Sequence, residues 1–376
     1  MTSHPRRHFL KGTLQGLALA SLGRITLANA ADDFTPLRQL AADKDMSFGF
    51  AVDPARIGAD EAYRNFVARQ ANLLVPENAL KWAQVHPAPD RFNFGPVDEL
   101  VAFARSHGQR VRGHTLCWHR ALPDWLKNVP RDDAEATLIA HIRSVMGHYR
   151  GQMVSWDVVN EAIEPGDGQP GDLRNGFWYR MLGARYVEIA YRAAHDADPQ
   201  AILCYNDYGL ETDSPSSERK RGAVLAMLRD LRHRGVPIHA VGLQSHLRAG
   251  DANRLGAGLS RFIQAIRDLD MAVYVTELDV DDSQIDAHAD GDAAVAATYK
   301  RYLDLVLDTK AASAVLTWGV WDPENPRRIG ATPEGALARA PLAFGRQGAL
   351  KPASWAVAHC LERAPHYPGL PRLTAR

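Results

Sequence analysis

Short apolar runs alternate with amphipathic stretches along most of this chain. The amphipathic stretches carry apolar side chains at helical spacing, for example Val97, Leu100, Val101 and Ala104. An alternation of strand and helix that repeats eight times predicts an α/β fold, a (β/α)8 TIM barrel in a single domain, rather than a doubly wound sheet with two domains. The eight runs that we predict as strands are residues 47–52, 72–76, 110–118, 154–159, 201–205, 240–243, 272–276 and 314–318.

Polar side chains follow the predicted strands at their carboxyl ends. In a (β/α)8 barrel these ends open onto one face, and that face holds the active site. The sequence therefore predicts that the chemistry of this protein lies there. The residues concerned are Glu77, Asn78 and Lys81; His114, Trp118 and His119; Asn160 and Glu161; Asn206, Asp207 and Tyr208; Gln244 and His246; Glu277 and Asp279; and Trp318.

Two of these glutamates form a candidate catalytic pair. Glu161 follows the fourth run and Glu277 the seventh, so a barrel places them across its mouth from each other. Hydrolysis of a glycosidic bond needs one carboxyl group as proton donor and a second carboxylate that attacks the anomeric carbon or activates a water. The alternative is that one or both glutamates only form ion pairs with Arg or Lys at the rim of the barrel.

Neighbouring side chains fit the same chemistry. Asn160 can donate a hydrogen bond to the sugar hydroxyl beside the reacting carbon. Because side chains alternate along a strand, Glu277 and Asp279 point to the same side, where His246 can bridge them and hold Glu277 ionised. Alternatively, His246 is only a histidine with satisfied hydrogen bonds near the rim.

Three tryptophans are candidates for the flat faces on which pyranose rings stack. Trp118 and Trp318 lie at strand ends and are better candidates than Trp82. The reason for this ranking is that a lone tryptophan is more often a core residue.

The composition and the cysteine spacing disfavour nucleic-acid binding, a disulfide framework and a zinc site. The chain has 376 residues, of which 46% are hydrophobic, and its 44 Lys and Arg balance its 44 Asp and Glu. A neutral balance does not favour nucleic acid as a partner. The three cysteines, Cys117, Cys204 and Cys360, are far apart in the sequence, which disfavours a disulfide framework or a zinc site. Two of them, Cys117 and Cys204, lie in apolar strand-like runs, where we expect buried free thiols. We expect no metal or cofactor and a monomeric mature protein.

The first thirty residues differ from the rest of the chain. Arg6 and Arg7 precede a mildly apolar run from residue 12 to 27, and Ala28-Asn29-Ala30 fits a cleavage site. This pattern predicts a twin-arginine signal peptide over residues 1–30 and a catalytic domain over residues 31–376. We expect an exported protein, periplasmic or secreted, with no membrane partner in its mature form. The alternative is a basic N-terminus before a short anchor helix.

Taken together, the motifs resemble those of glycoside hydrolase family 10, the endo-β-1,4-xylanases. The resemblance covers nearly all of the sequence after residue 30, and the motifs occur in the family's order. They are Glu-Asn-Ala-Leu-Lys-Trp (77–82), Gly-His-Thr-Leu-Cys-Trp-His (113–119), Trp-Asp-Val-Val-Asn-Glu-Ala (156–162), Asn-Asp-Tyr (206–208), Gln-Ser-His-Leu (244–247), Thr-Glu-Leu-Asp-Val (276–280) and Trp-Gly-Val (318–320).

The resemblance implies a retaining double displacement on xylan or xylo-oligosaccharides. Glu161 is then the acid/base and Glu277 the nucleophile. It also places Asn206 and Tyr208 on the leaving-group side of the scissile bond. The residues that it places around the glycone sugars are Glu77, Asn78, Lys81, His114, Trp118, Gln244 and Trp318.

The chain departs from the family pattern after the last predicted strand. The family has a second tryptophan in this loop, which covers the glycone sugars, and here Pro326 occupies its place. Trp321 replaces a small residue nearby, and our hypothesis is that Trp321 partly substitutes for the missing ring as a substrate-binding residue. Gly345 stands where the family usually has Asp, which we interpret as a structural difference.

These observations leave three alternative functions. The first is an active xylanase. The second is a hydrolase of another β-1,4-linked or aryl glycoside, because barrels of this kind change substrates through their loops. The third is a carbohydrate-binding protein without catalysis, whose usual sign would be a missing carboxylate, and both Glu161 and Glu277 are present.

Overall fold

The computed structural model describes residues 34–286, 290–323 and 339–369. The predicted signal peptide and Pro326 therefore lie outside the described residues. The strands are β1 (Ser47–Val52), β2 (Leu73–Pro76), β3 (Arg110–Cys117), β4 (Met153–Asn160), β5 (Ile202–Asp207), β6 (Ala240–Leu243), β7 (His246–Arg248), β8 (Ala272–Asp281) and β9 (Ala312–Thr317).

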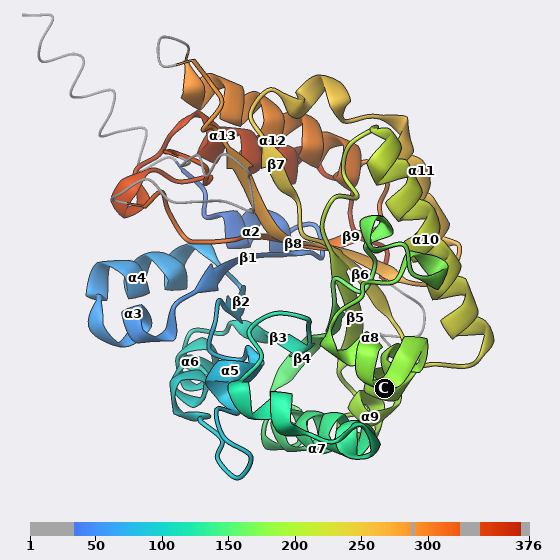
Figure 1. Cartoon of the computed structure of the whole chain (residues 1–376). Helices are drawn as coiled ribbons and strands as arrows, with labels where there is room; N and C mark the ends of the chain where they lie inside the picture. Colours follow the sequence, from blue (N-terminus) through green and yellow to red (C-terminus); the bar gives the residue numbers. More distant parts are fainter. Residues whose placement is uncertain (1–33, 287–289, 324–338, 370–376) are drawn as a thin grey trace, which may run out of the picture. The chain divides into compact units, whose positions relative to one another are not determined.

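Eight parallel strands close into a barrel. Each strand from β1 to β6 pairs with the next, β6 pairs with β8, β8 with β9, and β9 with β1. Figure 1 shows these strands in the middle of a ring of helices. The (β/α)8 barrel predicted from the alternation of apolar runs and helices is confirmed.

Helices connect successive strands and cover the outside of the barrel (Figure 1). They are α2 (Leu37–Ala42), α3 (Pro54–Ala59), α4 (Glu61–Gln70), α5 (Trp82–Val85), α6 (Gly95–Ser106), α7 (Ala134–His148), α8 (Phe177–Leu182), α9 (Tyr186–Ala197), α10 (Pro215–His233), α11 (Ala257–Arg267), α12 (Gly291–Leu307) and α13 (Pro352–Arg363). Short 3-10 segments are η1 (Asp124–Asn128), η2 (Arg131–Asp133), η3 (Pro165–Asp167), η4 (Pro170–Asp172), η5 (Gly183–Arg185), η6 (Asp251–Arg254) and η7 (Arg346–Gly348).

Several helices begin at a side chain that accepts a hydrogen bond from the first turn. The carboxylate of Asp60 accepts from the backbone N–H of Tyr63 at α4, and the hydroxyl of Ser214 accepts from the backbone N–H of Ser217 at α10. Pro215 follows Ser214 at the first helical position, where a proline removes no helical hydrogen bond. These caps fix where each helix starts and hence how long the preceding loop is.

Strand β8 extends farther than its apolar run predicts. The prediction ended at residue 276, whereas the strand continues through Glu277 and Asp279 to Asp281 with every residue buried. The additional strand β7 pairs with this extension and places His246 opposite Asp279. The extension contains polar residues, so the pattern of apolar residues did not predict it.

The interior of the barrel is filled by small and large side chains in turn. The buried cluster is Ala51, Leu73, Val75, Cys204, Ala240, Ala272, Tyr274, Ala314 and Leu316. Cys117, Cys204 and Cys360 are all buried and free, which confirms the prediction for Cys117 and Cys204. Gly113 on β3 is required by this packing, because a Cβ atom there would lie 2.1 Å from the ring of Trp156.

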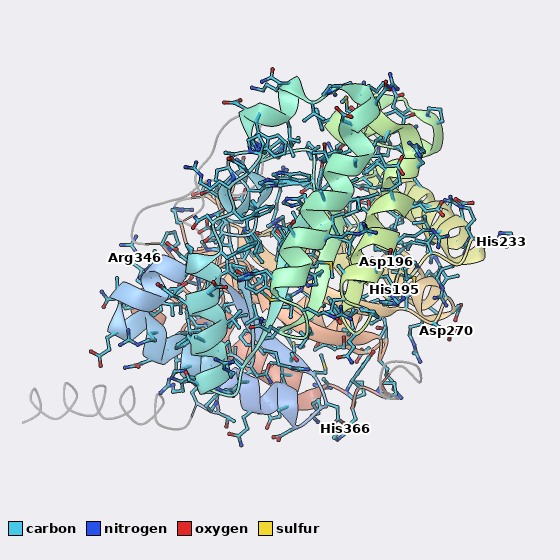
Figure 2. The ribbon with its side chains drawn as sticks, turned by 90° about the horizontal axis from the view of Figure 1, so that it is seen from below. His195, Asp196, His233, Asp270, Arg346 and His366 are labelled. Atoms are coloured by element: carbon cyan, nitrogen blue, oxygen red, sulfur yellow. The ribbon has the colours of Figure 1, made fainter. Side chains whose placement is uncertain are left out.

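The amino-terminal ends of the strands carry the helix ends and short loops that precede them. His195 lies near the end of α9, His233 ends α10, and Asp270 precedes β8; Figure 2 shows these residues on one side of the molecule. The polar residues predicted to carry the chemistry follow the strands instead. Among the described helices, none combines the length and the apolar character that a membrane span requires.

Candidate active site

Glu161 lies in a sharp turn directly after β4. Its backbone φ is +58°, a left-handed conformation that costs a non-glycine residue roughly 1–2 kcal/mol. Two hydrogen bonds hold the turn: the N–H of Glu161 donates to the Asn206 carbonyl at 2.9 Å, and Arg174 Nε donates to the Glu161 carbonyl at 2.7 Å. The turn ends the strand and leaves Glu161 at the barrel mouth with 8% of the residue exposed.

Neutral groups surround the Glu161 carboxyl group. Gln244 Nε2 donates to Glu161 Oε1 at 3.1 Å, and Asn160 Nδ2 donates to the same oxygen at 3.3 Å. Burial, followed by the negative charges of Asp207 and Glu277, raises the pKa of Glu161 above its ordinary value, against the hydrogen bonds from Trp118 and Gln244. Glu161 is therefore the carboxyl group that retains a proton more readily.

A neighbouring histidine does not supply a charge to Glu161. His119 Nδ1 lies 3.7 Å from Glu161 Oε2. Burial, together with the positive charges of Arg174 and Arg120, lowers the pKa of His119 to about 3. The ring is therefore neutral at ordinary pH, so it forms no ion pair with Glu161.

Glu277, in the extension of β8, has the opposite electrostatic setting. Asn206 Nδ2 donates to Glu277 Oε1 at 2.7 Å, and His246 Nε2 lies 3.3 Å from Glu277 Oε2. Burial by itself would raise the pKa of Glu277, but the hydrogen bond from His246 and the charges of His114 and His246 outweigh it and lower the pKa below the ordinary value. Glu277 is thus held as a carboxylate.

His246 forms the bridge predicted from the sequence. Its Nδ1 lies 3.0 Å from Asp279 Oδ1, while its Nε2 faces Glu277. Burial opposes the charged form, but Asp279 and then Glu277 raise the pKa of His246 well above its ordinary value. The imidazolium therefore donates from both nitrogens, and Asp279 fixes the direction in which it points.

Asn206 connects Asn160 and Glu277 through its side-chain amide. Its Nδ2 donates to Asn160 Oδ1 at 2.9 Å as well as to Glu277, and Thr276 Oγ1 donates to Asn206 Oδ1 at 2.6 Å. The Asn206 side chain fits because residue 242 is a glycine. A Cβ atom at that position would lie only 2.2 Å from Asn206 Oδ1. The resemblance placed Asn206 on the leaving-group side, whereas the fully buried amide lies beneath the carboxylates and positions Glu277. Asn206 has this position because it lies within β5, paired with β4 on one side and β6 on the other, and not in the loop that follows the strand.

The floor of the site contains a charged pair that the sequence analysis missed. Arg112 NH2 donates to Asp157 Oδ1, and His114 Nδ1 lies 2.9 Å from Asp157 Oδ2. Both Arg112 and Asp157 are fully buried. A charged residue inside a buried strand needs a partner, so Arg112 and Asp157 within apolar runs were a usable signal. The pair orients His114, whose Nδ1 lies 4.0 Å from Glu277 Oε1.

One group of the predicted substrate-binding residues gathers around Lys81. Lys81 Nζ donates to Asn78 Oδ1 at 2.7 Å and lies 5.5 Å and 5.6 Å from the ring centroids of Trp118 and Trp318. Burial lowers the pKa of Lys81, and the charges of Glu277 and Glu77 oppose this effect. The structure thus brings together a cation, an amide and two aromatic faces, a combination suited to a sugar.

Tyr208, beyond the end of β5, belongs to a second polar network. Its hydroxyl donates to Glu164 Oε2 at 3.0 Å and accepts from Arg174 NH2 at 2.9 Å. Lys220 Nζ lies 3.7 Å from the ring centroid of Tyr208 and 2.7 Å from Asp207 Oδ1. Glu164, Arg174 and Lys220 were not predicted, because they come from two loops and a helix with no shared spacing.

Trp321 is not brought to the carboxylates. It is 8% exposed, and its ring packs edge-on against Tyr63 and Phe66 of α4 at centroid distances of 5.3 Å and 5.4 Å. This is the placement of a core residue, and it does not support the hypothesis that Trp321 covers the sugar. Pro326 and the rest of that loop lie outside the described residues. Trp82, the weaker stacking candidate, is a core residue, 3% exposed and stacked on His141.

Comparison with known proteins agrees with this geometry. The model of glycosyl hydrolase family 10 matches residues 36–360. The endo-1,4-beta-xylanase B of Thermotoga neapolitana is 34% identical over 322 residues, which cover 83% of this chain and 88% of that protein.

Solved structures with the same fold include two xylanases. The native xylanase 10B of Thermotoga maritima has a TM-score of 0.78 at 30% identity, covering 91% of this chain and 100% of that one. A mutant of an intracellular xylanase of Thermoanaerobacterium saccharolyticum, in complex with xylotriose, has a TM-score of 0.76 at 31% identity, covering 87% and 99%. Since the family match spans the barrel that holds both carboxylates, the chain is a glycoside hydrolase and belongs to glycosyl hydrolase family 10.

Proposed function

We propose that this protein is a retaining endo-1,4-β-xylanase that cleaves internal bonds of xylan. The observation that carries the proposal is the pair of buried carboxyl groups with opposite pKa shifts, Glu161 raised and Glu277 lowered. A retaining glycosidase needs one protonated and one ionised carboxyl group at the start of its cycle.

In the first step Glu277 is the nucleophile. One of its carboxylate oxygens attacks the anomeric carbon, and the glycosidic C–O bond breaks with its electron pair moving to the leaving oxygen. Glu161 donates its proton to that oxygen, so the leaving sugar departs as an alcohol. The donors Asn206 and His246 keep the attacking carboxylate ionised and aimed.

In the second step Glu161 acts as a base. It takes a proton from a water whose oxygen attacks the anomeric carbon, and the ester bond breaks with its electrons returning to Glu277. The covalent bond removes the negative charge of Glu277, which is one cause of the raised pKa of Glu161. Glu161 is therefore protonated before the first step and more easily ionised before the second.

The choice of xylan is supported by the relatives. The similar proteins above are described as xylanases, and one of them was solved with xylotriose. A second candidate is another β-1,4-linked glycoside, because a relative that is 31% identical over 356 residues is called an exoglucanase; this chain covers 30% of its length.

The test is hydrolysis of glucuronoxylan, arabinoxylan and carboxymethyl-cellulose by the purified protein. We expect reducing ends from both xylans and initial products that are β-anomers by NMR. Release from carboxymethyl-cellulose alone would support the second candidate. No release from any xylan would contradict the proposed function, and an initial α-product would contradict retention.

We also propose export through the twin-arginine signal over residues 1–30 and a monomeric mature protein. Arg6 and Arg7 and the Ala28-Asn29-Ala30 sequence support the export proposal. Sequencing the N-terminus of the exported protein should give a start near Ala31, and replacing both Arg6 and Arg7 by Lys should retain the protein inside the cell. An unprocessed intracellular protein in unaltered cells would contradict export. Light scattering on the mature protein tests the monomer.

A further inference from the structure

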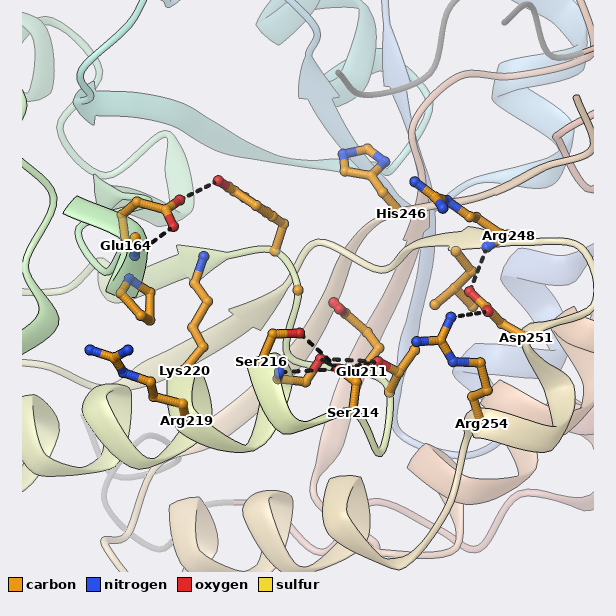
Figure 3. A pocket seen from close by; sticks show the side chains of 17 residues that line it. Glu164, Glu211, Ser214, Ser216, Arg219, Lys220, His246, Arg248, Asp251 and Arg254 are labelled. Atoms are coloured by element: carbon orange, nitrogen blue, oxygen red, sulfur yellow. Dashed lines mark hydrogen bonds and ion pairs between the residues drawn. The ribbon is translucent and has the colours of Figure 1, made fainter. Parts of the chain in front are cut away.

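A pocket of about 520 Å³ extends from the active site on the side of Tyr208. Its lining comes from the segments that follow β4, β5 and β6, together with the start of α10 and strand β7. Figure 3 shows Glu164, Arg219 and Lys220 on one side of this pocket and His246 and Arg248 on the other. Because His246 also contacts Glu277, the pocket adjoins the reaction centre. Tyr208, which the family resemblance places on the leaving-group side, also lines it.

Besides the imidazolium of His246, which Asp279 and Glu277 bind, four lysine and arginine side chains line the pocket. Three of these four pair with carboxylates. Arg219 pairs with Asp172 at 2.6 Å, Lys220 with Asp207 at 2.7 Å, and Arg254 with Asp251 at 3.2 Å. The fourth is Arg248. Within the described part of the chain, no carboxylate oxygen lies within 4.0 Å of the Arg248 guanidinium.

The acidic residues of the pocket have other partners. Glu211 is buried and accepts from the backbone N–H groups of Leu210 and Ser245 at 2.7 Å and 2.9 Å. Glu164 binds Arg174 and Tyr208. Among the described residues, the guanidinium of Arg248 is therefore the arginine or lysine charge of the pocket that has no carboxylate partner and can bind a ligand.

The backbone holds Arg248 at a defined place. Strand β7 pairs with β8, with Arg248 opposite Asp281, and the backbone N–H of Arg248 donates to Asp251 Oδ2 at 3.2 Å. Side chains alternate along a strand, so Arg248 points to the same side as His246, about 7 Å farther along. The guanidinium thus lies one step beyond the residue that contacts the nucleophile.

We infer that Arg248 binds the carboxylate of a uronic acid branch on the xylan backbone, on the leaving-group side of the scissile bond. The inference rests on the proposed function and adds a substrate class to it, acidic branched xylan. A guanidinium matches a carboxylate in charge and in its two-pronged geometry. The cavity beside it is large enough for a branch that leaves the main chain, and Tyr208 and Lys220 close its other side.

The test compares two polymers that differ only in charge. One is glucuronoxylan, and the other is the same polymer with its carboxyl groups chemically reduced to alcohols. We expect the unaltered protein to have a lower KM on the acidic polymer. Arg248→Ala should raise KM on the acidic polymer about threefold to fivefold more than on the reduced one, the size expected for an ion pair near the surface.

Two further variants and a salt series complete the test. Arg248→Lys should keep part of the preference because it keeps the charge, whereas Arg261→Ala, on the exposed part of α11, removes one charge elsewhere and should keep all of it. Raising NaCl from about 0.05 M to about 0.5 M should reduce the preference of the unaltered protein, because the Debye length shortens severalfold.

The outcomes separate this inference from the proposed function. Equal effects of Arg248→Ala on both polymers, or no effect on either, would overturn the role of Arg248 while leaving xylanase activity in place. A loss of preference in Arg261→Ala would also overturn it, because net charge would then be the cause. Absence of turnover on linear xylohexaose by the unaltered protein would overturn both.

Discussion

The ends of β4 and β8 place the same side chain in two different electrostatic environments. Glu161 and Glu277 both follow or extend a barrel strand and are 8% and 5% exposed. Burial acts on both in the same direction, yet the pKa of Glu161 is raised and that of Glu277 is lowered. Burial therefore does not decide which carboxyl group is the acid.

The difference lies in the donors that each carboxyl group meets. Glu161 accepts hydrogen bonds from the neutral amides of Gln244 and Asn160. Glu277 faces the imidazolium of His246, whose charge Asp279 supports. Positive neighbours around Glu277, with His246 first, and negative neighbours around Glu161, with Asp207 first, divide the roles between the two glutamates.

Removing the charged carboxylate should have the largest effect. Glu277→Gln keeps the shape of the side chain but cannot form the covalent intermediate, so kcat on xylan should fall by at least about 10⁴-fold. Reducing-end release measures this. The matched control is Glu99→Gln on the exposed face of α6, which should retain full activity. A Glu277→Gln variant with more than a few per cent of normal activity would contradict the assignment.

Removing the protonated carboxyl group should have a smaller effect that depends on the substrate. Glu161→Gln removes the general acid, so turnover of xylan should fall by about 10²–10⁴-fold. An aryl glycoside whose leaving group needs no proton should form the covalent intermediate at nearly the normal rate, visible as a burst of released phenol. Equal losses on both substrates would mean that Glu161 does not act as the acid.

Removing the imidazolium of His246 should bring the pKa values of Glu161 and Glu277 closer together. In His246→Gln, Glu277 loses a charge-assisted hydrogen bond of roughly 1.5–3 kcal/mol, so kcat/KM should fall by about 10- to 150-fold.

The pH profile distinguishes this effect from simple structural damage. Activity requires ionised Glu277 and is lost as the pH falls through its pKa, which the substitution raises, so the acid limb of kcat/KM should move to higher pH. The alkaline limb follows Glu161 and should stay in place. A uniform loss at every pH would mean that His246 supports the fold rather than the charge of Glu277.

Trp321, which follows β9, should affect stability rather than catalysis. Trp321 packs against Tyr63 and Phe66, so Trp321→Ala should destabilise the fold by about 3–5 kcal/mol, the scale of large-to-small changes in a core. Thermal unfolding measures this, with Trp355→Ala, an exposed tryptophan on α13, as the mild control. An unchanged Tm with a raised KM on xylo-oligosaccharides would instead restore the hypothesis that Trp321 covers the sugar.

Features that depend on residues close together in the sequence could be predicted from the sequence. The alternation of apolar runs and helices predicted the barrel, and the residues after each run predicted that Glu161 and Glu277 lie at one end of it. The two-residue spacing of Glu277 and Asp279 predicted the bridge through His246, because side chains alternate along a strand.

Features that depend on contacts between distant segments were decided only by the tertiary structure. Asn206 lies beneath the carboxylates because Gly242 on the next strand leaves room for it. Trp321 is a core residue because α4 packs over it. Arg248 has no carboxylate partner among the residues that the structure describes, because Asp251 pairs with Arg254 and accepts from the backbone N–H of Arg248. Local spacing sets the direction of a side chain, whereas burial and charge depend on neighbours that the chain brings together only on folding.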